Sequence, residues 1–316
     1  MTHASRRQGR SAVRTTGERG LALIVAMLVA ALAAAVAISL ATAQAQWTAQ
    51  VAQRRDQVQA QSIALAGLQW TRQILDATRS APFNHLGEAW ALPLPATPVE
   101  NGSVEGHIVD AQGMLNVNNL ADGNQTVLER QRFDRLFNAL RVPPATLAAM
   151  VDWVDSDSIE EPGGAEDSWY GRMAQPGLAA NMPVVRIDEL AAVRGVNPTV
   201  LAAMTRFVTA LPDATPLNVN TAPAELLAAS IDGVEPAALA TLLASRTQQP
   251  FQNIGDFRAR LPQGASPIGP DSMYTVKSRF FLVSVRARQG DTVAQARALI
   301  DRAGSASPRV VWQTIE

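Results

Sequence analysis

The longest apolar stretch of the chain lies near its N-terminus and predicts a membrane-spanning helix. Residues 21–43 carry no charged side chain and consist mostly of Ala, Leu and Val. At about 1.5 Å per residue this helix would be about 35 Å long, enough to cross a hydrocarbon core of about 30 Å. Neither Gly nor Pro occurs from Leu21 to Leu65, so we expect the helix to continue beyond the membrane.

Apolar side chains recur at heptad-like spacing after this span, interrupted by Arg54 and Gln61. The pattern predicts a helix to about Arg79, because the prolines from Pro82 onward prevent its continuation. The apolar stripe suits packing on the protein's own sheet and packing against neighbouring helices equally well. Its members are Trp47, Val51, Val58, Leu65, Leu68 and Leu75.

Two widely separated segments have the alternating pattern of β-strands. Residues 99–110 start with an Asn-Gly turn and predict one short strand or a hairpin. Residues 274–288 give the strongest strand signal, and a turn at 289–291 leads into further strands near the chain's end. Helical patterns fill residues 113–268. The predicted fold class is therefore α+β: a long N-terminal helix and a small antiparallel sheet interrupted by a large all-α insertion.

The insertion contains an imperfect repeat, in which Leu-Asn-Val-Asn occurs from Leu115 and again from Leu217. Each copy precedes a helical pattern, and we expect Asn118 and Asn220 to cap those helices. The second copy leads into a segment that resembles helix-hairpin-helix and SAM-like modules. Such hairpins bind phosphate through glycine amides and nearby cations, but here the turn at 232–235 has one glycine between two carboxylates. We therefore expect protein-binding or structural modules and no nucleic acid.

Charge is distributed unevenly, although the net charge is only -1. The segment before Gly20 holds five arginines and one acid, so the positive-inside rule predicts a cytoplasmic N-terminus and an extracytoplasmic bulk. Residues 41–43 also fit a secretory cleavage site that would leave Gln44 as the first residue. An uncleaved signal anchor starting at Met1 is the simpler alternative.

The candidate chemistry argues against an enzyme. Cysteine is absent, which excludes disulfides, thiolate zinc sites and cysteine nucleophiles. His3, His85 and His107 are isolated from one another in the sequence and form no recognisable triad or metal pair. The chain also lacks a glycine-rich phosphate loop between a strand and a helix.

An acidic stretch between the two repeat copies predicts a cation site. Seven carboxylates occur between Asp152 and Asp167 without a basic residue among them, and Trp153 and Trp169 indicate a packed loop. Oxygen ligands at irregular spacing suit calcium, although the spacing is not that of an EF-hand. The alternative is a solvated acidic loop paired with Arg172 and Arg186.

The chain resembles the K-type minor pseudopilins (GspK) of type II secretion systems, both in its basic leader and in the acidic segment from Asp152 to Tyr170. The resemblance implies that prepilin peptidase cleaves after Gly20 and leaves Leu21, whose methylation stays open, as the N-terminus. Val25 then occupies the position where most pilins carry glutamate, a departure associated with this family. The resemblance also implies a pilin-like head and a calcium site. The implied ligands are Asp155, Asp157, Glu166, Asp167 and Asp152, the last of which either binds calcium or orients the turn.

The resemblance implies a structural role in the bacterial inner membrane, at the tip of the periplasmic pseudopilus. The expected partners are the I- and J-type minor pseudopilins, the major pseudopilin and prepilin peptidase. Two alternatives remain: a membrane-anchored DNA-uptake receptor built on helix-hairpin-helix modules, and a minor pilin of a type IV pilus.

The sequence predicts six consecutive segments. They are a removed leader at 1–20, a transmembrane helix at 21–43, its periplasmic continuation at 44–80, a first part of the sheet domain at 81–112, the helical insertion with its metal-binding loop at 113–268, and the remaining strands at 269–316.

Overall fold

The computed structural model describes residues 16–121, 126–304 and 307–316, with side chains from Gly20 onward. It divides into two compact units, Met1–Val58 and Gln59–Glu316. The predicted basic leader falls largely on residues 1–15, which lie outside the described residues.

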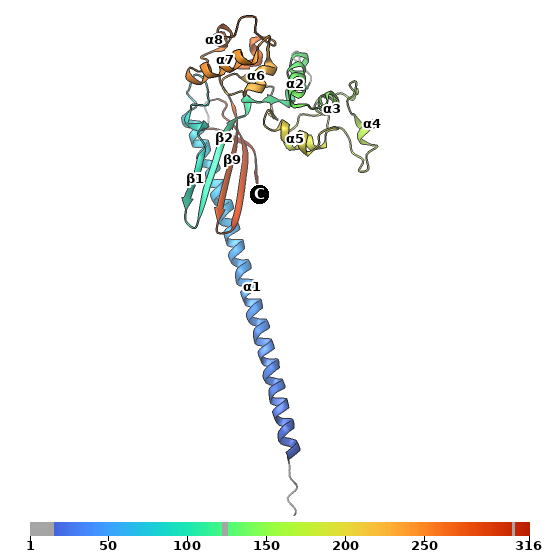
Figure 1. Cartoon of the computed structure of the whole chain (residues 1–316), viewed down its shortest axis with the longest axis vertical. Helices are drawn as coiled ribbons and strands as arrows, with labels where there is room; N and C mark the ends of the chain where they lie inside the picture. Colours follow the sequence, from blue (N-terminus) through green and yellow to red (C-terminus); the bar gives the residue numbers. More distant parts are fainter. Residues whose placement is uncertain (1–15, 122–125, 305–306) are drawn as a thin grey trace, which may run out of the picture. The chain divides into compact units, whose positions relative to one another are not determined.

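The first unit is the N-terminal part of one long helix, α1 (Thr16–Ala77), whose last turns belong to the second unit (Figure 1). In the described part of the chain, α1 from Gly20 onward is the one helix long and apolar enough to span a membrane. Its apolar side chains from Leu21 to Leu40 are exposed. Trp47, Val51 and Val58 of the predicted stripe are exposed as well.

The second unit is built on a five-stranded antiparallel sheet with the strand order β1-β2-β9-β10-β11. Its strands come from two distant parts of the sequence, because β2 pairs directly with β9. The strands are β1 (Leu94–Val99), β2 (Gly102–Asp110), β9 (Phe280–Gln289), β10 (Thr292–Asp301) and β11 (Arg309–Ile315).

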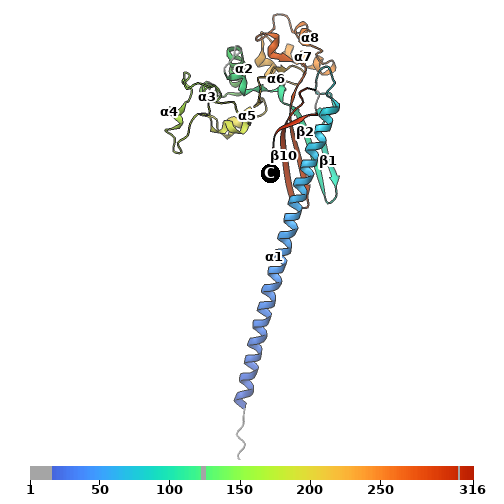
Figure 2. The same cartoon turned by 180° about the vertical axis from the view of Figure 1, so that it is seen from behind.

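The C-terminal turns of α1 lie across one face of this sheet (Figure 2). Leu68 and Leu75 of the predicted stripe are buried there, together with small residues that allow close approach, Ala60 and Ala64. Gly67 marks the closest contact: a Cβ atom at this position would lie 2.6 Å from Val285 Cγ1. The helix can pack this tightly at these positions because very small residues alternate there with the larger Leu68 and Leu75.

The insertion is mostly helical rather than all-α, since it also contains three two-stranded ladders. Its helices are α2 (Thr126–Leu140), α3 (Pro144–Val154), α4 (Asp167–Tyr170), α5 (Pro198–Met204), α6 (Ala224–Ser230), α7 (Pro236–Gln248) and α8 (Ile254–Ala259). Its short strands are β3 (Leu115–Asn116), β4 (Val208–Thr209), β5 (Leu217–Asn218), β6 (Ile231–Asp232), β7 (Ser266–Pro267) and β8 (Tyr274–Thr275). The described residues of the second unit also form five 3-10 helices: Ala89–Ala91, Ala111–Gly113, Val117–Leu120, Ile187–Ala192 and Asp271–Met273.

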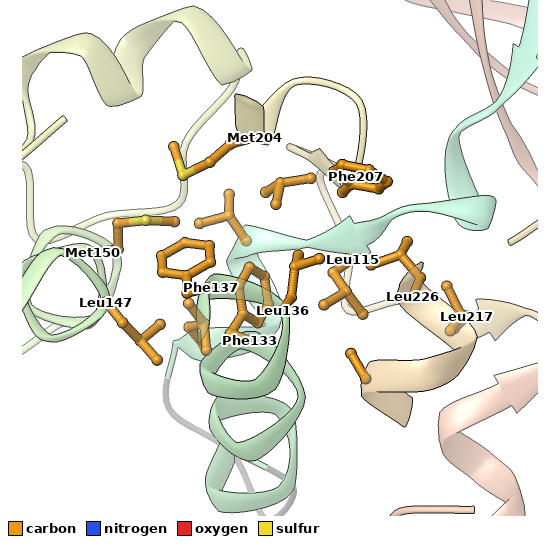
Figure 3. Close-up of a cluster of buried hydrophobic side chains, with 14 of the residues drawn as sticks. Leu115, Phe133, Leu136, Phe137, Leu147, Met150, Met204, Phe207, Leu217 and Leu226 are labelled. Carbon is orange, nitrogen blue, oxygen red and sulfur yellow. The ribbon is translucent and has the colours of Figure 1, made fainter. Parts of the chain in front are cut away.

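The insertion has a hydrophobic core separate from the one beneath α1. Figure 3 shows Phe133 and Phe137 of α2 pointing into this core, where Met150 of α3 and Met204 of α5 also lie. All four side chains are almost completely buried. The insertion therefore has an apolar interior of its own within the second unit.

Asp110, at the end of β2, joins the sheet to the insertion. Its buried carboxylate accepts hydrogen bonds from Gln112 N–H at 2.9 Å, Asn218 Nδ2 at 2.9 Å, Thr221 Oγ1 at 2.6 Å and Ser278 Oγ at 2.6 Å. Burial raises the pKa of Asp110, whereas these donors favour its ionised form. One side chain thus connects the start of the insertion with its middle and its end.

The repeated Leu-Asn-Val-Asn segments form clamps, and the prediction that Asn118 and Asn220 cap helices is wrong. Asn118 accepts a hydrogen bond from Val184 N–H at 2.9 Å and donates one to Val184 C=O at 2.8 Å. Asn220 makes the same pair with Phe251, at 2.8 Å in both directions. The N-cap of α6 is instead Pro223. The side-chain amide satisfies both backbone groups of a distant loop residue, as a strand neighbour would.

The strand predicted at 274–288 is two strands. Tyr274–Thr275 pairs in parallel with Leu217–Asn218 inside the insertion, and β9 of the main sheet starts at Phe280. The predicted segment at 99–110 contains β2, and its hairpin partner β1 lies almost entirely before that segment. Residues 111–279 lie between β2 and β9, while the predicted domain limits at 113 and 268 stay predictions.

We expect Gly67→Leu to lower the free energy of unfolding by about 2 kcal/mol, because the new side chain overpacks the contact with Val285. Urea unfolding of the detergent-solubilised chain measures this change. Ala66→Leu is the matched control, since Ala66 is the exposed neighbour on the same helix. Equal effects of the two substitutions would contradict tight packing at Gly67.

Candidate metal centre in the acidic loop

The acidic loop, residues 152–170, connects the end of α3 to the short helix α4. Asp155 ends α3, and its N–H still donates to Val151 C=O at 3.0 Å. Asp157 then makes a local turn in which its Oδ1 accepts from Ile159 N–H at 2.8 Å. The chain turns back through Gly163, whose φ of 86° lies in the left-handed region that favours glycine.

Asp152 organises the loop from inside. Its Oδ1 accepts from Glu161 N–H at 3.1 Å and its Oδ2 from Ala165 N–H at 2.6 Å. Gly164 makes this possible, because a Cβ there would lie 2.0 Å from Asp152 Oδ2. Burial raises the pKa of Asp152, while these two backbone bonds favour its ionised form. The Gly-Gly pair therefore lets the loop backbone close around one carboxylate.

Aromatic side chains anchor the loop on the insertion. Tyr170 packs edge-on against Trp153 and Trp169, with ring centroids 5.2 and 4.9 Å apart. Arg194 lies over Trp169 and donates to Gly164 C=O at 2.7 Å. The loop is therefore packed, as its tryptophans predict.

Three carboxylates converge where the loop returns to α3. One oxygen from each of Asp155, Asp157 and Glu166 lies within 4.8 Å of the other two. Asp155 and Glu166 are buried, with 8% and 4% of their surfaces exposed, and Asp157 is exposed. Two unit charges about 5 Å apart repel by about 3 kcal/mol at an effective dielectric constant of about 20. Folding the loop therefore brings together groups that a cation would stabilise.

The environment of Glu166 gives the clearest indication that the loop binds a cation. Both carboxylate oxygens of Glu166 are buried, and neither accepts a hydrogen bond of normal geometry within the part of the chain that the structure describes. Burial raises the pKa of Glu166, weak hydrogen bonding from the Asn181 side-chain amide and the Asp167 N–H lowers it, and the charges of Asp152 and Asp167 raise it. A buried carboxylate whose only donors are so poorly placed is costly unless it is protonated or binds a cation.

The donor set fits a hard cation such as calcium, because it consists of oxygen atoms at irregular spacing around a turn that glycine makes possible. Asp155, Asp157 and Glu166 of the predicted ligands come together. Asp152 and Asp167 fall outside this group: Asp152 binds the loop amides, and Asp167 Oδ1 accepts from Ala179 N–H at 2.8 Å.

The alternative pairing of the loop with Arg172 and Arg186 does not match the ion pairs of the described residues. Arg186 pairs with Asp188 at 2.7 Å, and Glu161 of the loop pairs with Arg130 at 3.0 Å.

Sequence reasoning missed Asn181, a residue outside the acidic run whose side chain contacts the loop. Its Nδ2 donates to Asp157 C=O at 2.8 Å. An Asn beyond the acidic run carried no signal that would have identified it.

The predicted processing residues lie in α1. Gly20 has open space around it, because an added Cβ would meet nothing within 4 Å. Leu21 and Val25 are exposed, at 66% and 50%. Cleavage after Gly20 stays a prediction.

Comparison with known proteins identifies the family. Models of type II secretion system protein K match residues 113–213 and 217–277. The protein K of Aeromonas hydrophila is 32% identical over 239 residues, which are 69% of this chain and 72% of the relative. The protein K of Klebsiella pneumoniae is 28% identical over 305 residues, which are 91% and 93% of the two chains.

The fold also matches a solved structure. A chain of the GspK–GspI–GspJ complex from the type 2 secretion system of enterotoxigenic Escherichia coli superposes with a TM-score of 0.74 and 22% identity. The match covers 84% of this chain and 99% of that one. The chain therefore belongs to the protein K family of type II secretion systems, the minor pseudopilins.

Proposed function

We propose that this minor pseudopilin starts or caps the periplasmic pseudopilus at its tip, together with the I- and J-type minor pseudopilins. The observation that carries the proposal is the likeness of the fold to almost the full length of a chain in a complex named for GspK, GspI and GspJ. The insertion between β2 and β9 supports the tip position, because another subunit could not easily follow above so large a head. The major pseudopilin then continues the filament below it.

The role is structural, and we propose neither catalysis nor nucleic-acid binding. The turn that resembles a helix-hairpin-helix carries Asp232 and Glu235, and Asp232 pairs with Arg135 at 2.9 Å. A phosphate approaching this turn would meet carboxylates rather than free cations. The equivalent clamps of Asn118 and Asn220 support two related helical modules, of the helix-hairpin-helix or SAM-like type, and we propose that these modules bind protein partners.

The N-terminal helix fits an assembly role in the inner membrane. We propose that the leader is cytoplasmic, that prepilin peptidase removes it after Gly20, and that the bulk of the chain is periplasmic. Val25 provides no carboxylate to offset the terminal ammonium group of a neighbouring subunit. Such a subunit suits a filament end, where no neighbour needs that charge.

Calcium is the metal we propose for the acidic loop. Asp155, Asp157 and Glu166 would hold it, and Asp152 would keep the loop backbone in the shape that brings them together. The cation would supply the positive charge that buried Glu166 otherwise lacks. Its role is to stabilise the insertion, since a ligand that binds only the folded state favours that state by mass action.

Calcium added to chelator-treated full-length protein should raise its melting temperature. At a free concentration of about 100 times the dissociation constant, the expected stabilisation is about 2.7 kcal/mol. Glu166→Gln should abolish the shift, and Glu160→Gln, a change in the same loop outside the carboxylate group, should retain it. An unshifted wild-type protein in millimolar calcium, or an equal shift in Glu166→Gln, would rule out this site.

N-terminal sequencing of the mature protein tests the processing step. We expect Leu21 as the first residue of the wild-type protein and an uncleaved leader in Gly20→Val, because a bulkier residue blocks the peptidase. Val25→Glu is the control and should be cleaved normally. A wild-type chain that starts at Gln44 would indicate a secreted protein, and one that starts at Met1 an uncleaved anchor.

A further inference from the structure

The segment between α4 and the 3-10 helix at Ile187–Ala192 leaves the acidic loop and returns to it at two points. Ala179 N–H donates to Asp167 Oδ1 at 2.8 Å. Asn181 Nδ2 donates to Asp157 C=O at 2.8 Å and to Ser158 Oγ at 3.3 Å. Asn181 thus lies against the turn that carries Asp157.

These hydrogen bonds fix the direction of the Asn181 amide. The opposite orientation would place its oxygen against the carbonyl oxygen of Asp157, which cannot donate. The backbone of Asn181 has a φ of 45°, in the left-handed region that asparagine tolerates better than most residues. Local conformation and hydrogen bonding therefore hold the side chain in one position.

The oxygen of this amide has no protein partner. Asn181 Oδ1 is buried and accepts no hydrogen bond from any residue described here. A buried amide oxygen left unsatisfied costs about 1–3 kcal/mol. Both oxygens of Glu166 likewise lack a hydrogen bond of normal geometry. Buried oxygens without such a bond thus occur both in the acidic loop and on Asn181, whose amide nitrogen bonds to the turn that carries Asp157.

We propose that Asn181 is a further ligand of the cation, binding through Oδ1. The inference rests on the calcium site proposed above and deepens it. A neutral amide oxygen is a normal ligand of calcium and adds no repulsion to the carboxylates. The cation would then cross-link the acidic loop to residues 171–182. Leu178 and Met182 of this segment are exposed, and the metal would hold them in a fixed position on the surface.

Terbium luminescence tests the ligand directly. Tb³⁺ replaces Ca²⁺ at oxygen sites, the nearby Trp169 can sensitise its emission, and lifetimes in H₂O and D₂O give the number of bound waters. In full-length protein, Asn181→Ala should add about one water to the bound ion and weaken binding at least about tenfold. Ser158→Ala removes a partner of Nδ2 but leaves Oδ1, and should leave the number of waters unchanged.

Asn138→Ala is the matched control, because Asn138 is exposed and bonds to Asp134 away from the loop. An unchanged water count in terbium-loaded Asn181→Ala would overturn the inference while leaving the carboxylate site intact. A wild-type protein that binds no terbium would overturn the metal proposal as well.

Limited trypsin digestion tests the cross-link separately. Cleavage at exposed Arg172 should be slowed by calcium in the wild-type protein and much less in Asn181→Ala at saturating calcium. Equal protection of both proteins would show that the metal does not hold this segment through Asn181.

Discussion

The antiparallel pairing of β2 with β9 is the constraint on which the rest of the structure depends. It opposes Gly102 to Gln289 and Asp110 to Phe281, so the two ends of the insertion emerge side by side. An insertion whose ends are adjacent can be large without disturbing its host. The same pairing aligns Ile108, Val283 and Val285 on the face that receives α1. The β2–β9 ladder therefore joins the helix, the sheet and the insertion. At the end of β2, Asp110 accepts hydrogen bonds from residues near the start and the end of the insertion.

The acidic loop is held together against electrostatic repulsion, because its folding brings carboxylates close to one another. Packing of Tyr170 with its neighbouring tryptophans and the bonds of Asp152 supply enough structure to hold the loop closed. Those contacts leave the buried Glu166 carboxylate without a hydrogen bond of normal geometry, which is costly in the absence of a cation. Calcium would offset this cost by pairing with the carboxylates. Through Asn181 it would also hold residues 171–182 against the loop.

Local sequence signals predicted the long helix, the interrupted sheet and the acidic loop. These features depend on apolar length, strand alternation and charge density, which are visible over short windows. The break between Tyr274–Thr275 and β9 was missed because both pieces have strand character, and only tertiary pairing separates them. Asn118 and Asn220 resembled helix caps because capping asparagines and loop-clamping asparagines look alike in sequence. Asn181 was not predictable, since its role depends on a chain reversal that brings it back to Asp157.

Together these features describe a subunit whose helix serves assembly and whose head suits a filament end. The position of the subunit at the pseudopilus tip is tested most directly by locating it in isolated pseudopili. Because the chain has no cysteine, a single cysteine introduced at exposed Gly177 can be labelled with gold without background. Electron microscopy should then show label at one end of each filament. Label distributed along the shaft would contradict the account.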